Sequence, residues 1–180
     1  MTKPVRDMRK NLRLLAREAD DGGVPFRIAR FAPLRHADAI AAIEPIEPWA
    51  SLGYPAGWLE TYLTRRDTAL YRFTLLRENE SGDVAPAGYM AVRFPWLVGP
   101  FLELLAIAPE HQGSGLGAFA VARLQQAAHR AERQLWTSVA LHNPRAARFY
   151  ERLGFVPTAD VPDLLRPGFT ERLLRYDARP

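Results

Sequence analysis

The stretch that decides the fold is "FLELLAIAPEHQGSGLG", residues 101–117, in which a dense apolar run leads into three glycines. The apolar residues of 101–108 do not alternate with polar ones, which predicts a strand buried on both faces. A helix is expected next, because apolar residues then recur at helical spacing, at Leu116, Phe119, Ala120, Leu124, Ala127 and Ala131. The stretch therefore predicts a strand, a glycine loop and a helix in direct succession.

The glycine loop is placed to bind a phosphate through its backbone. The first turn of a helix carries N–H groups without partners and a partial positive charge. Glycine lets a phosphate approach these groups without a Cβ in the way. A turn without a ligand would need only one glycine, whereas Gly113, Gly115 and Gly117 lie within five residues. We interpret the loop as a phosphate site, and a purely structural turn is the alternative.

Two other glycine motifs fit this loop less well. A P-loop ends in Gly-Lys-Ser/Thr, but Gly117 is followed by Ala118, so this interpretation fails. Gly113, Gly115 and Ala118 match the dinucleotide pattern G-x-G-x-x-G/A. That unit usually opens its domain and has an acid at the end of the next strand, and "SVALHN" (138–143) has none. A dinucleotide site is therefore disfavoured.

Outward from this stretch, the chain alternates between strands and helices. Strands are expected at 26–32, 69–78, 85–94, 101–108, 134–142 and 170–177, and further helices at 35–44, 56–66 and 143–155. The last helix has Asn143 as its N-cap, Pro144 at its first position and Gly154 as its stop. Residues 95–100 and 157–169 are expected as loops. This order predicts a mixed α/β fold.

The domain organisation follows from the amino-terminal segment. Residues 1–22 carry an amphipathic pattern, "MRKNLRLLAREA", that ends at "DDGG". We expect an N-terminal extension with a loosely attached helix over 1–22 and a single domain over 23–180. The segment has no apolar stretch of the kind found in a secretory signal.

Composition bounds the function classes. The chain has 180 residues, 48% of them hydrophobic and 24% charged, as in ordinary soluble domains. The absence of cysteine excludes disulfides, thiolate metal sites and a cysteine nucleophile. No His/Asp/Glu cluster has metal-ligand spacing and no apolar stretch could span a membrane. We expect a cytoplasmic protein with no metal and no membrane partner.

The net charge of +4 and the pI near 9.8 are compatible with a nucleic acid, an anionic membrane or a polyphosphate ligand. The arginines are spread along the chain and do not form a run. We therefore expect no nucleic-acid partner, although an arginine-rich nucleic-acid binder is one alternative function class.

Two motifs together resemble the GNAT superfamily of acetyl-CoA-dependent N-acetyltransferases. Gln112, Gly115 and Gly117 form Q-x-x-G-x-G, which is similar to the family's pyrophosphate loop. The segment "NPRAARFYERLGF" (143–155) is similar to its N-x-x-A-x-x-F-Y-x-x-x-G-F segment. The order of elements extends the likeness to residues 26–177. The resemblance implies a central mixed, mostly antiparallel sheet of about six to seven strands, flanked by helices, with a splayed central strand pair.

The resemblance also implies how acetyl-CoA is held. Backbone N–H groups of the glycine loop would bind the pyrophosphate, and the backbone of the preceding strand would pair with the pantetheine arm, with one amide serving the oxyanion. Asn143 would bind that arm as well. The cofactor-binding residues expected are Leu105, Ala106, Ile107, Gln112, Gly113, Ser114, Gly115, Leu116, Gly117, Asn143, Ala146 and Tyr150.

Two side chains are expected to be catalytic. Glu103 is the one charge in the apolar run, and an isolated buried carboxylate is costly, which favours its neutral form and suits a general base for an ammonium. A structural ion pair with Arg93 is the alternative. By the resemblance, Tyr150 would give a proton to the leaving thiolate. A core tyrosine is the alternative there.

The acceptor is expected to be a primary amine, on a small molecule, a protein N-terminus or a lysine, that attacks directly in a ternary complex. Its contacts would come from "EPIEPWASLGYP" (44–55) and from the loops near 95–100 and 157–169. Glu44 and Glu47, with Trp49 and Tyr54, could receive a cationic amine. The alternative is a loop whose Trp packs on the core. A non-catalytic acyl-CoA-binding regulatory module is the rival function, and the protein is expected to be a monomer or homodimer.

Overall fold

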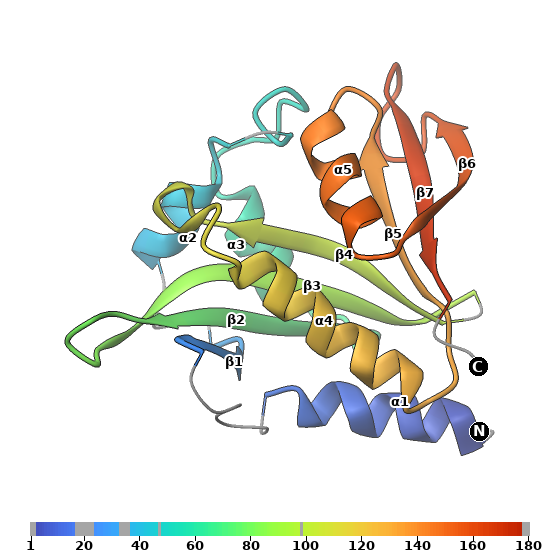
Figure 1. Cartoon of the computed structure of the whole chain (residues 1–180). Helices are drawn as coiled ribbons and strands as arrows, with labels where there is room; N and C mark the ends of the chain where they lie inside the picture. The colour runs from blue at the N-terminus through green and yellow to red at the C-terminus, as the bar shows by residue number, and fades with distance from the viewer. Residues whose placement is uncertain (1–2, 17–23, 33–36, 47, 98, 178–180) are drawn as a thin grey trace.

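The protein is built on one seven-stranded sheet in the order β1-β2-β3-β4-β5-β7-β6 (Figure 1). The computed structural model describes residues 3–16, 24–32, 37–46, 48–97 and 99–177. The strands are β1 Phe26–Arg30, β2 Leu70–Glu78, β3 Val84–Trp96, β4 Gly99–Ile107, β5 Leu135–Ala140, β6 Val156–Pro162 and β7 Thr170–Tyr176. The β4–β5 pair is parallel, and the other pairs are antiparallel. The expected mixed, mostly antiparallel sheet is confirmed.

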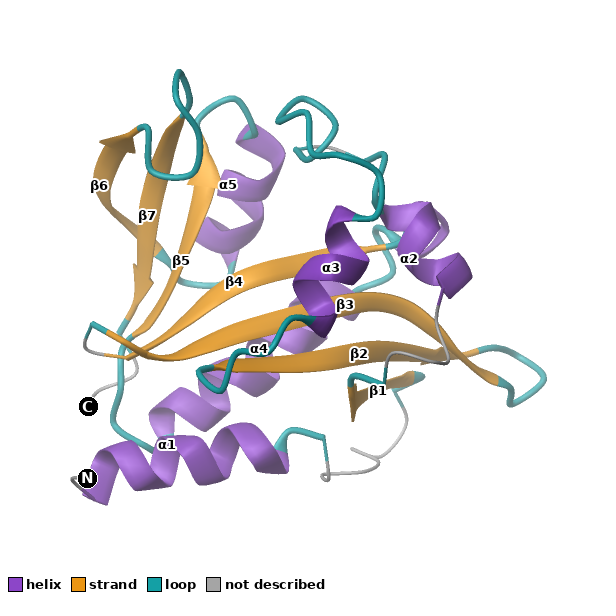
Figure 2. Cartoon of the chain, turned by 180° about the vertical axis from the view of Figure 1, so that it is seen from behind, coloured by secondary structure: helices purple, strands orange, loops and turns teal. Residues whose placement is uncertain are grey.

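Helices cover both faces of this sheet. One face carries α1 (Lys3–Leu14) and α4 (Leu116–His129), and the other carries α2 (Ala37–Ile43) and α3 (Trp58–Thr64), as Figure 2 shows from behind. A further helix, α5 (Pro144–Arg152), contributes Tyr150 to the same core as α1 and α4. The core under α2 and α3 is a separate cluster that contains Leu104 and Ala106. The sheet therefore separates two hydrophobic cores.

The first helix is firmly attached. Met8 and Leu12 are fully buried and Leu15 is 3% exposed, all in the core with α4. The Asn11 side chain also donates a hydrogen bond of 3.0 Å to the carbonyl oxygen of Ala127. The helix expected over 1–22 is thus present at Lys3–Leu14, but the expectation of loose attachment is wrong. The boundary between 1–22 and 23–180 stays a prediction.

Two segments expected as loops are partly strand. Residues 157–169 include most of β6, which pairs antiparallel with β7. In the segment 95–100, β3 runs to Trp96 and β4 begins at Gly99, which pairs with Trp96. Prolines suggested loops in both segments. An edge strand such as β6 tolerates proline, because the missing N–H needs no partner on its open side.

The centre of the sheet opens between β4 and β5. These strands pair only at Phe101–Trp136 and Leu102–Thr137. At this last rung the Thr137 hydroxyl donates a hydrogen bond of 3.0 Å to the carbonyl oxygen of Leu102. Beyond it the strands diverge (Figure 1), so the splayed central pair is confirmed.

A β-bulge lies at Glu103, where the strands separate. Ala91 of β3 pairs with Leu104 and the next residue, Val92, pairs with Leu102, so Glu103 has no pairing partner. Leu102 consequently packs in the core under α4, whereas Leu104 packs in the core under α2 and α3.

Residues along β4 alternate between buried and partly buried, and both faces of the strand are packed. Leu105 and Ile107 contact the core under α4. Leu104 and Ala106 lie in the core under α2 and α3. The prediction of a strand packed on both faces is therefore confirmed. The apolar residues that suggested it include partly exposed ones that line a cavity, such as Leu105.

Candidate active site

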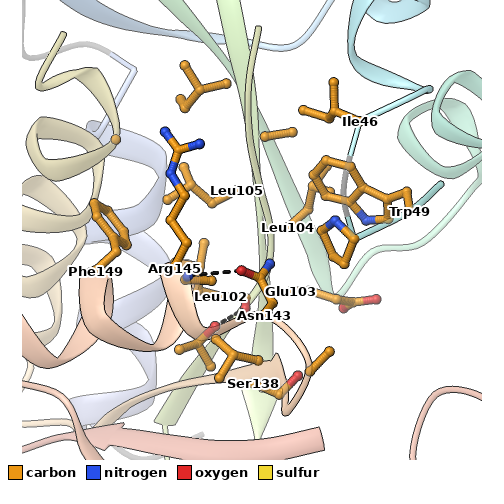
Figure 3. Close-up of a pocket in the computed structure, with 18 of the residues that line it drawn as sticks. Ile46, Trp49, Leu102, Glu103, Leu104, Leu105, Ser138, Asn143, Arg145 and Phe149 are labelled. Atoms are coloured by element: carbon orange, nitrogen blue, oxygen red, sulfur yellow. Dashed lines mark hydrogen bonds between the residues drawn. The ribbon is translucent and has the colours of Figure 1, made fainter. Parts of the chain in front are cut away.

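A continuous cavity of about 1160 Å³ occupies the gap between β4 and β5. Its walls come from β4, the glycine loop, β5 and α5, and from the segment between α2 and α3. Figure 3 shows Phe149 and Arg145 on one side of β4, and Ile46 and Trp49 on the other. We call these sides the loop half, with the glycine loop and α5, and the α3 half, with residues 46–65. The cavity therefore connects the two faces of the sheet.

The glycines of the loop have two different structural reasons. Gly113 has φ +76° and Gly115, the N-cap of α4, has φ +93°, in the left-handed region that side chains disfavour. Gly117 is helical, and a Cβ there would lie 3.4 Å from the ring of Phe149. A Cβ at Gly113 would meet nothing within 4 Å, so the space beside it is open.

The loop leaves alternate N–H groups available. The N–H groups of Gln112 and Ser114 donate within the loop, to Pro109 at 3.2 Å and to His111 at 3.4 Å. Phe119 makes the first helical bond of α4, to the carbonyl of Gly115 at 2.9 Å. The N–H groups of Gly113, Gly115 and Gly117 remain for a ligand. The N–H of Leu116 also remains, because its hydrogen bond to the Ser114 hydroxyl is long, at 3.5 Å. Of the backbone N–H groups of residues 112–117 that were expected to bind a phosphate, these four are therefore available.

The open edge of β4 is the second binding feature. From Glu103 to Ile107 the strand pairs with no described strand on its β5 side. This unpaired edge lies along the cavity, which Leu105 and Ile107 line. The Gln112 side chain already donates to the carbonyl oxygen of Ile107 at 3.2 Å. Gln112 therefore braces the loop against the strand.

Backbone groups alternate in direction along a strand, and Ala108 donates to Ala87 of the β3 side, so Ala106 also faces β3 and its expected contact with a ligand is not available. The N–H and C=O of Leu105 and the N–H of Ile107 face the open edge and are left for a ligand.

Helix α5 closes the loop half of the cavity. Asn143 accepts a hydrogen bond of 3.0 Å from the N–H of Ala146, which confirms it as the N-cap (Figure 3). Gly154 has φ +82° just past the helix, as a stop requires. Arg145 and Arg152 also line the cavity and were missed from the sequence. Their spacing of seven residues places them on one face of a helix, a signal within the motif that was available.

Tyr150 lies at the divergence of the two strands. It is 7% exposed, lines the cavity, and makes ring contacts with Phe149 at 5.0 Å and Phe155 at 5.3 Å. Burial raises the pKa of Tyr150 to about 12, which a hydrogen bond with Thr137 partly opposes. The phenol therefore keeps its proton at neutral pH, and its raised pKa makes it a weaker acid than a free tyrosine.

Glu103 is not an isolated charge. Its carboxylate is bound by Arg93 Nε at 2.6 Å and by Arg65 Nη2 at 3.2 Å. Asp67 contacts the same two guanidinium groups, at 3.0 Å from Arg93 and 3.6 Å from Arg65. The ion pair weighed as the alternative is thus present, and the premise of a lone buried carboxylate is wrong. The bulge at Glu103 is the physical reason, because it lets this side chain reach Arg93 and Arg65 on the α3 side.

Sequence comparison identifies the family. The sequence model of the Acetyltransferase (GNAT) family matches residues 34–155. The chain belongs to the GNAT family. Acetyl-CoA dependence is a general property of this family.

Solved GNAT structures share the fold. An acetyltransferase from Thermus thermophilus is 25% identical, with a TM-score of 0.62 over 85% of this chain and 98% of that one. The ribosomal-protein-S18-alanine N-acetyltransferase from Escherichia coli is 18% identical, with a TM-score of 0.61 over 86% and 95%. An aminoglycoside 6'-N-acetyltransferase complexed with coenzyme A is 13% identical, with a TM-score of 0.61 over 85% and 97%. The last two show similarity of fold alone.

A second carboxyl lines the cavity of this GNAT domain and was missed from the sequence. Glu171 of β7 is 3% exposed and lies opposite Ala140 of β5, on the same sheet face as Ser138. Burial raises the pKa of Glu171, partly opposed by a hydrogen bond with Ser138 and by His142. Its place in the charged strand "TERLLRY" gives no signal, since only the β5–β7 pairing brings it to the cavity.

The segment expected to select the acceptor of this GNAT protein is only partly in place. Glu44 caps α3, since its carboxylate accepts from the N–H groups of Gly57 at 3.0 Å and Leu59 at 3.1 Å. It is therefore not available to a cationic substrate, and Glu47 lies outside the described residues. Trp49 and Tyr54 do line the cavity.

The two loops expected to contribute do so unequally. The 95–100 segment does not line the cavity in its described part, where Trp96 packs on Phe101 at 4.6 Å and Trp136 at 5.6 Å. From 157–169, Leu165 alone reaches the cavity. The expectation is therefore wrong for the described part of 95–100.

Within the described ranges, no group of three His, Cys, Asp or Glu side chains is arranged to hold a metal ion. Nor does any helix that the structure describes have the length and apolar character to cross a bilayer. The expectations of no metal and no membrane partner stay predictions.

Proposed function

We propose that this protein is an N-acetyltransferase that moves an acetyl group from acetyl-CoA to a primary amine, by direct attack in a ternary complex. The observation that carries the proposal is the single cavity through the splayed sheet. The cavity connects the backbone N–H groups of the loop half, which can bind a phosphate, with the Glu103 carboxylate on the α3 half. A donor and an acceptor that enter from opposite faces would meet at β4.

The residues of the loop half fit acetyl-CoA. Gly113 and Gly115 present N–H groups with no Cβ between them and a ligand, at the start of α4, where a diphosphate is favoured. Arg145 and Arg152 lie beside this site and can pair with further phosphate charge. The open edge of β4 supplies backbone groups to the amide-bearing arm. The aminoglycoside acetyltransferase that shares the fold has coenzyme A bound.

The proposed reaction transfers the acetyl group directly from sulfur to nitrogen. The neutral amine nitrogen attacks the thioester carbonyl, the C–N bond forms, and the C–S bond breaks to release coenzyme A as a thiolate. One proton leaves the amine nitrogen for a carboxylate, and Tyr150 gives a proton to the thiolate. Exchange with water then removes the proton from the carboxyl and returns one to the Tyr150 phenolate. The N–H group of Leu105, on the open edge of β4, stabilises the carbonyl oxygen as it gains charge.

We assign the proton from the amine to Glu103. Its side chain is 23% exposed and within reach of a substrate, whereas Glu171 is 3% exposed. Because the Glu103 carboxylate is held by two arginines, proton transfer through a water is the form expected. Glu171, whose pKa is raised by burial, is the competing base.

The first experiment separates binding from turnover. Thermal shift with acetyl-CoA, CoA and NAD is expected to show stabilisation by the CoA compounds alone, of about 2.7 kcal/mol at a hundredfold excess over Kd. Release of CoA is then followed against a panel of amines. Binding without acetylation of any amine would favour the non-catalytic acyl-CoA-binding module, and stabilisation by NAD alone would reject the proposal.

Three further predictions concern the setting of the protein. We expect a cytoplasmic protein, a monomer or homodimer, and no nucleic-acid partner. Sedimentation measures the oligomeric state. Tight DNA binding that weakens steeply with salt would contradict the last of these.

A further inference from the structure

The α3 half of the cavity has a definite chemical character. Ten described residues between Ile46 and Arg65 line it, and all but Thr61 and Arg65 are apolar or aromatic. Trp58 stands at the centre of this wall, with ring centroids 5.4 Å from Trp49 and 4.8 Å from Tyr54. The largest favourable free energy of binding to such a surface comes from removing apolar area of a ligand from water.

Cation–π binding on this wall is already partly used. The Arg65 guanidinium lies 4.5 Å from the ring centroid of Tyr62, and that of Arg166 lies 5.9 Å from the ring of Tyr54. Aromatic rings attract cations, but these two carry the chain's own cations. A substrate with several positive charges would therefore compete with fixed arginines.

The carboxylates near this wall are already paired within the protein or buried. Glu44 caps α3, Glu103 is paired with Arg65 and Arg93, and Glu171 is 3% exposed beside Ser138. Within the part of the chain that the structure describes, the cavity thus has no unpaired, accessible carboxylate for a second or third ammonium group. A polycation would be desolvated there without a partner, which is costly.

The geometry points to an acceptor with a single primary amine on an apolar or aromatic body. This inference rests on the proposed function and names its substrate class. The body packs on the wall of Trp49, Tyr54 and Trp58, and the amine extends toward Glu103. The same chemistry is found in a free arylalkylamine and in a peptide whose first residue is apolar.

Calorimetry with CoA-bound protein tests the inference without turnover. We expect 2-phenylethylamine to bind, and the polycations spermidine and kanamycin to show at least about 100-fold weaker affinity. A peptide with an N-terminal phenylalanine forms a third arm and distinguishes the two sources of the amine. Spermidine or kanamycin binding as tightly as 2-phenylethylamine, or binding of none of these amines, overturns the inference. Failure of CoA itself to bind would instead refute the proposed function.

A matched pair of tryptophan variants locates the effect. Trp49→Ala is expected to raise KM for 2-phenylethylamine about tenfold or more while the Kd for CoA stays unchanged, since the lost contact is on the α3 half. Trp96→Ala removes a similarly half-buried tryptophan outside the cavity, and KM should be unchanged. Equal KM values for Trp49→Ala and the wild type would overturn the assignment of this wall.

Discussion

The two halves of the cavity are built in different ways. The loop half uses mainly backbone groups from one continuous stretch, from Leu105 to Gly117. The α3 half uses side chains from separate elements, joined by the ion pairs of Glu103 with Arg65 and Arg93. A site made of backbone groups needs glycines at fixed positions, and these are visible in the sequence. A site made of side chains depends on which elements meet.

The largest expected effect breaks the α3 half. Glu103→Gln removes the proposed base and should lower kcat by about 100-fold. The measurement is steady-state release of CoA across a pH range, with Kd for CoA determined in parallel.

Asp67→Asn is the matched control for this change. Asp67 contacts the same two arginines as Glu103 but does not line the cavity. It removes one negative charge from the same network, so kcat should stay within a few-fold of the wild type. Equal losses in both variants would show that Glu103 acts only through the ion pairs. A larger loss in Glu171→Gln would transfer the role of base to Glu171.

The next effect concerns the loop half. Gly115→Ala places a Cβ at φ +93°, at a strain of roughly 1–2 kcal/mol, and displaces the N–H groups that bind the diphosphate. Affinity for CoA should fall about tenfold or more, as expected for lost hydrogen bonds to a charged group. Gly82→Ala introduces the same strain at φ +85° in the β2–β3 turn, away from the cavity, and Kd should not change. Similar Kd values for Gly115→Ala and Gly82→Ala would contradict the phosphate site.

A smaller effect lies where the halves meet. Tyr150→Phe should lower kcat about tenfold and leave Kd for CoA unchanged, because the thiolate leaves without a proton donor but is itself only moderately basic. Tyr176→Phe, a tyrosine of β7 outside the cavity, should leave both unchanged. Equal losses of kcat and CoA affinity in Tyr150→Phe would reject the acid role.

The smallest effect is a pH dependence of stability. Burial raises the pKa of Glu171 above its ordinary value of 4.5, so the folded protein holds this proton more tightly than the unfolded chain. The stabilising contribution is therefore full below pH 4.5 and is lost as the pH rises through the folded pKa. Glu171→Gln should therefore gain stability relative to the wild type as the pH rises above 4.5, measured by urea unfolding. A difference that does not change with pH would contradict the raised pKa.

The sequence by itself determined the elements whose signals are local. The strand–loop–helix unit around Gly115, the N-cap at Asn143 and the stop at Gly154 follow from backbone conformations that few residues adopt. These signals, with the order of elements, sufficed for a mixed α/β fold, whereas the mostly antiparallel sheet with its splayed centre was implied by the resemblance of two motifs to the GNAT family. The loop half of the site was predictable from the same local signals.

Only the tertiary structure decided the rest, because it depends on pairing between distant residues. The bulge at Glu103 arises from the β3–β4 register and sets which charges this carboxylate meets. Glu171 reaches the cavity only through the β5–β7 pairing, and β6 is stable as an edge strand despite its prolines. The attachment of α1 likewise depends on contact with α4, which amphipathic spacing alone does not reveal.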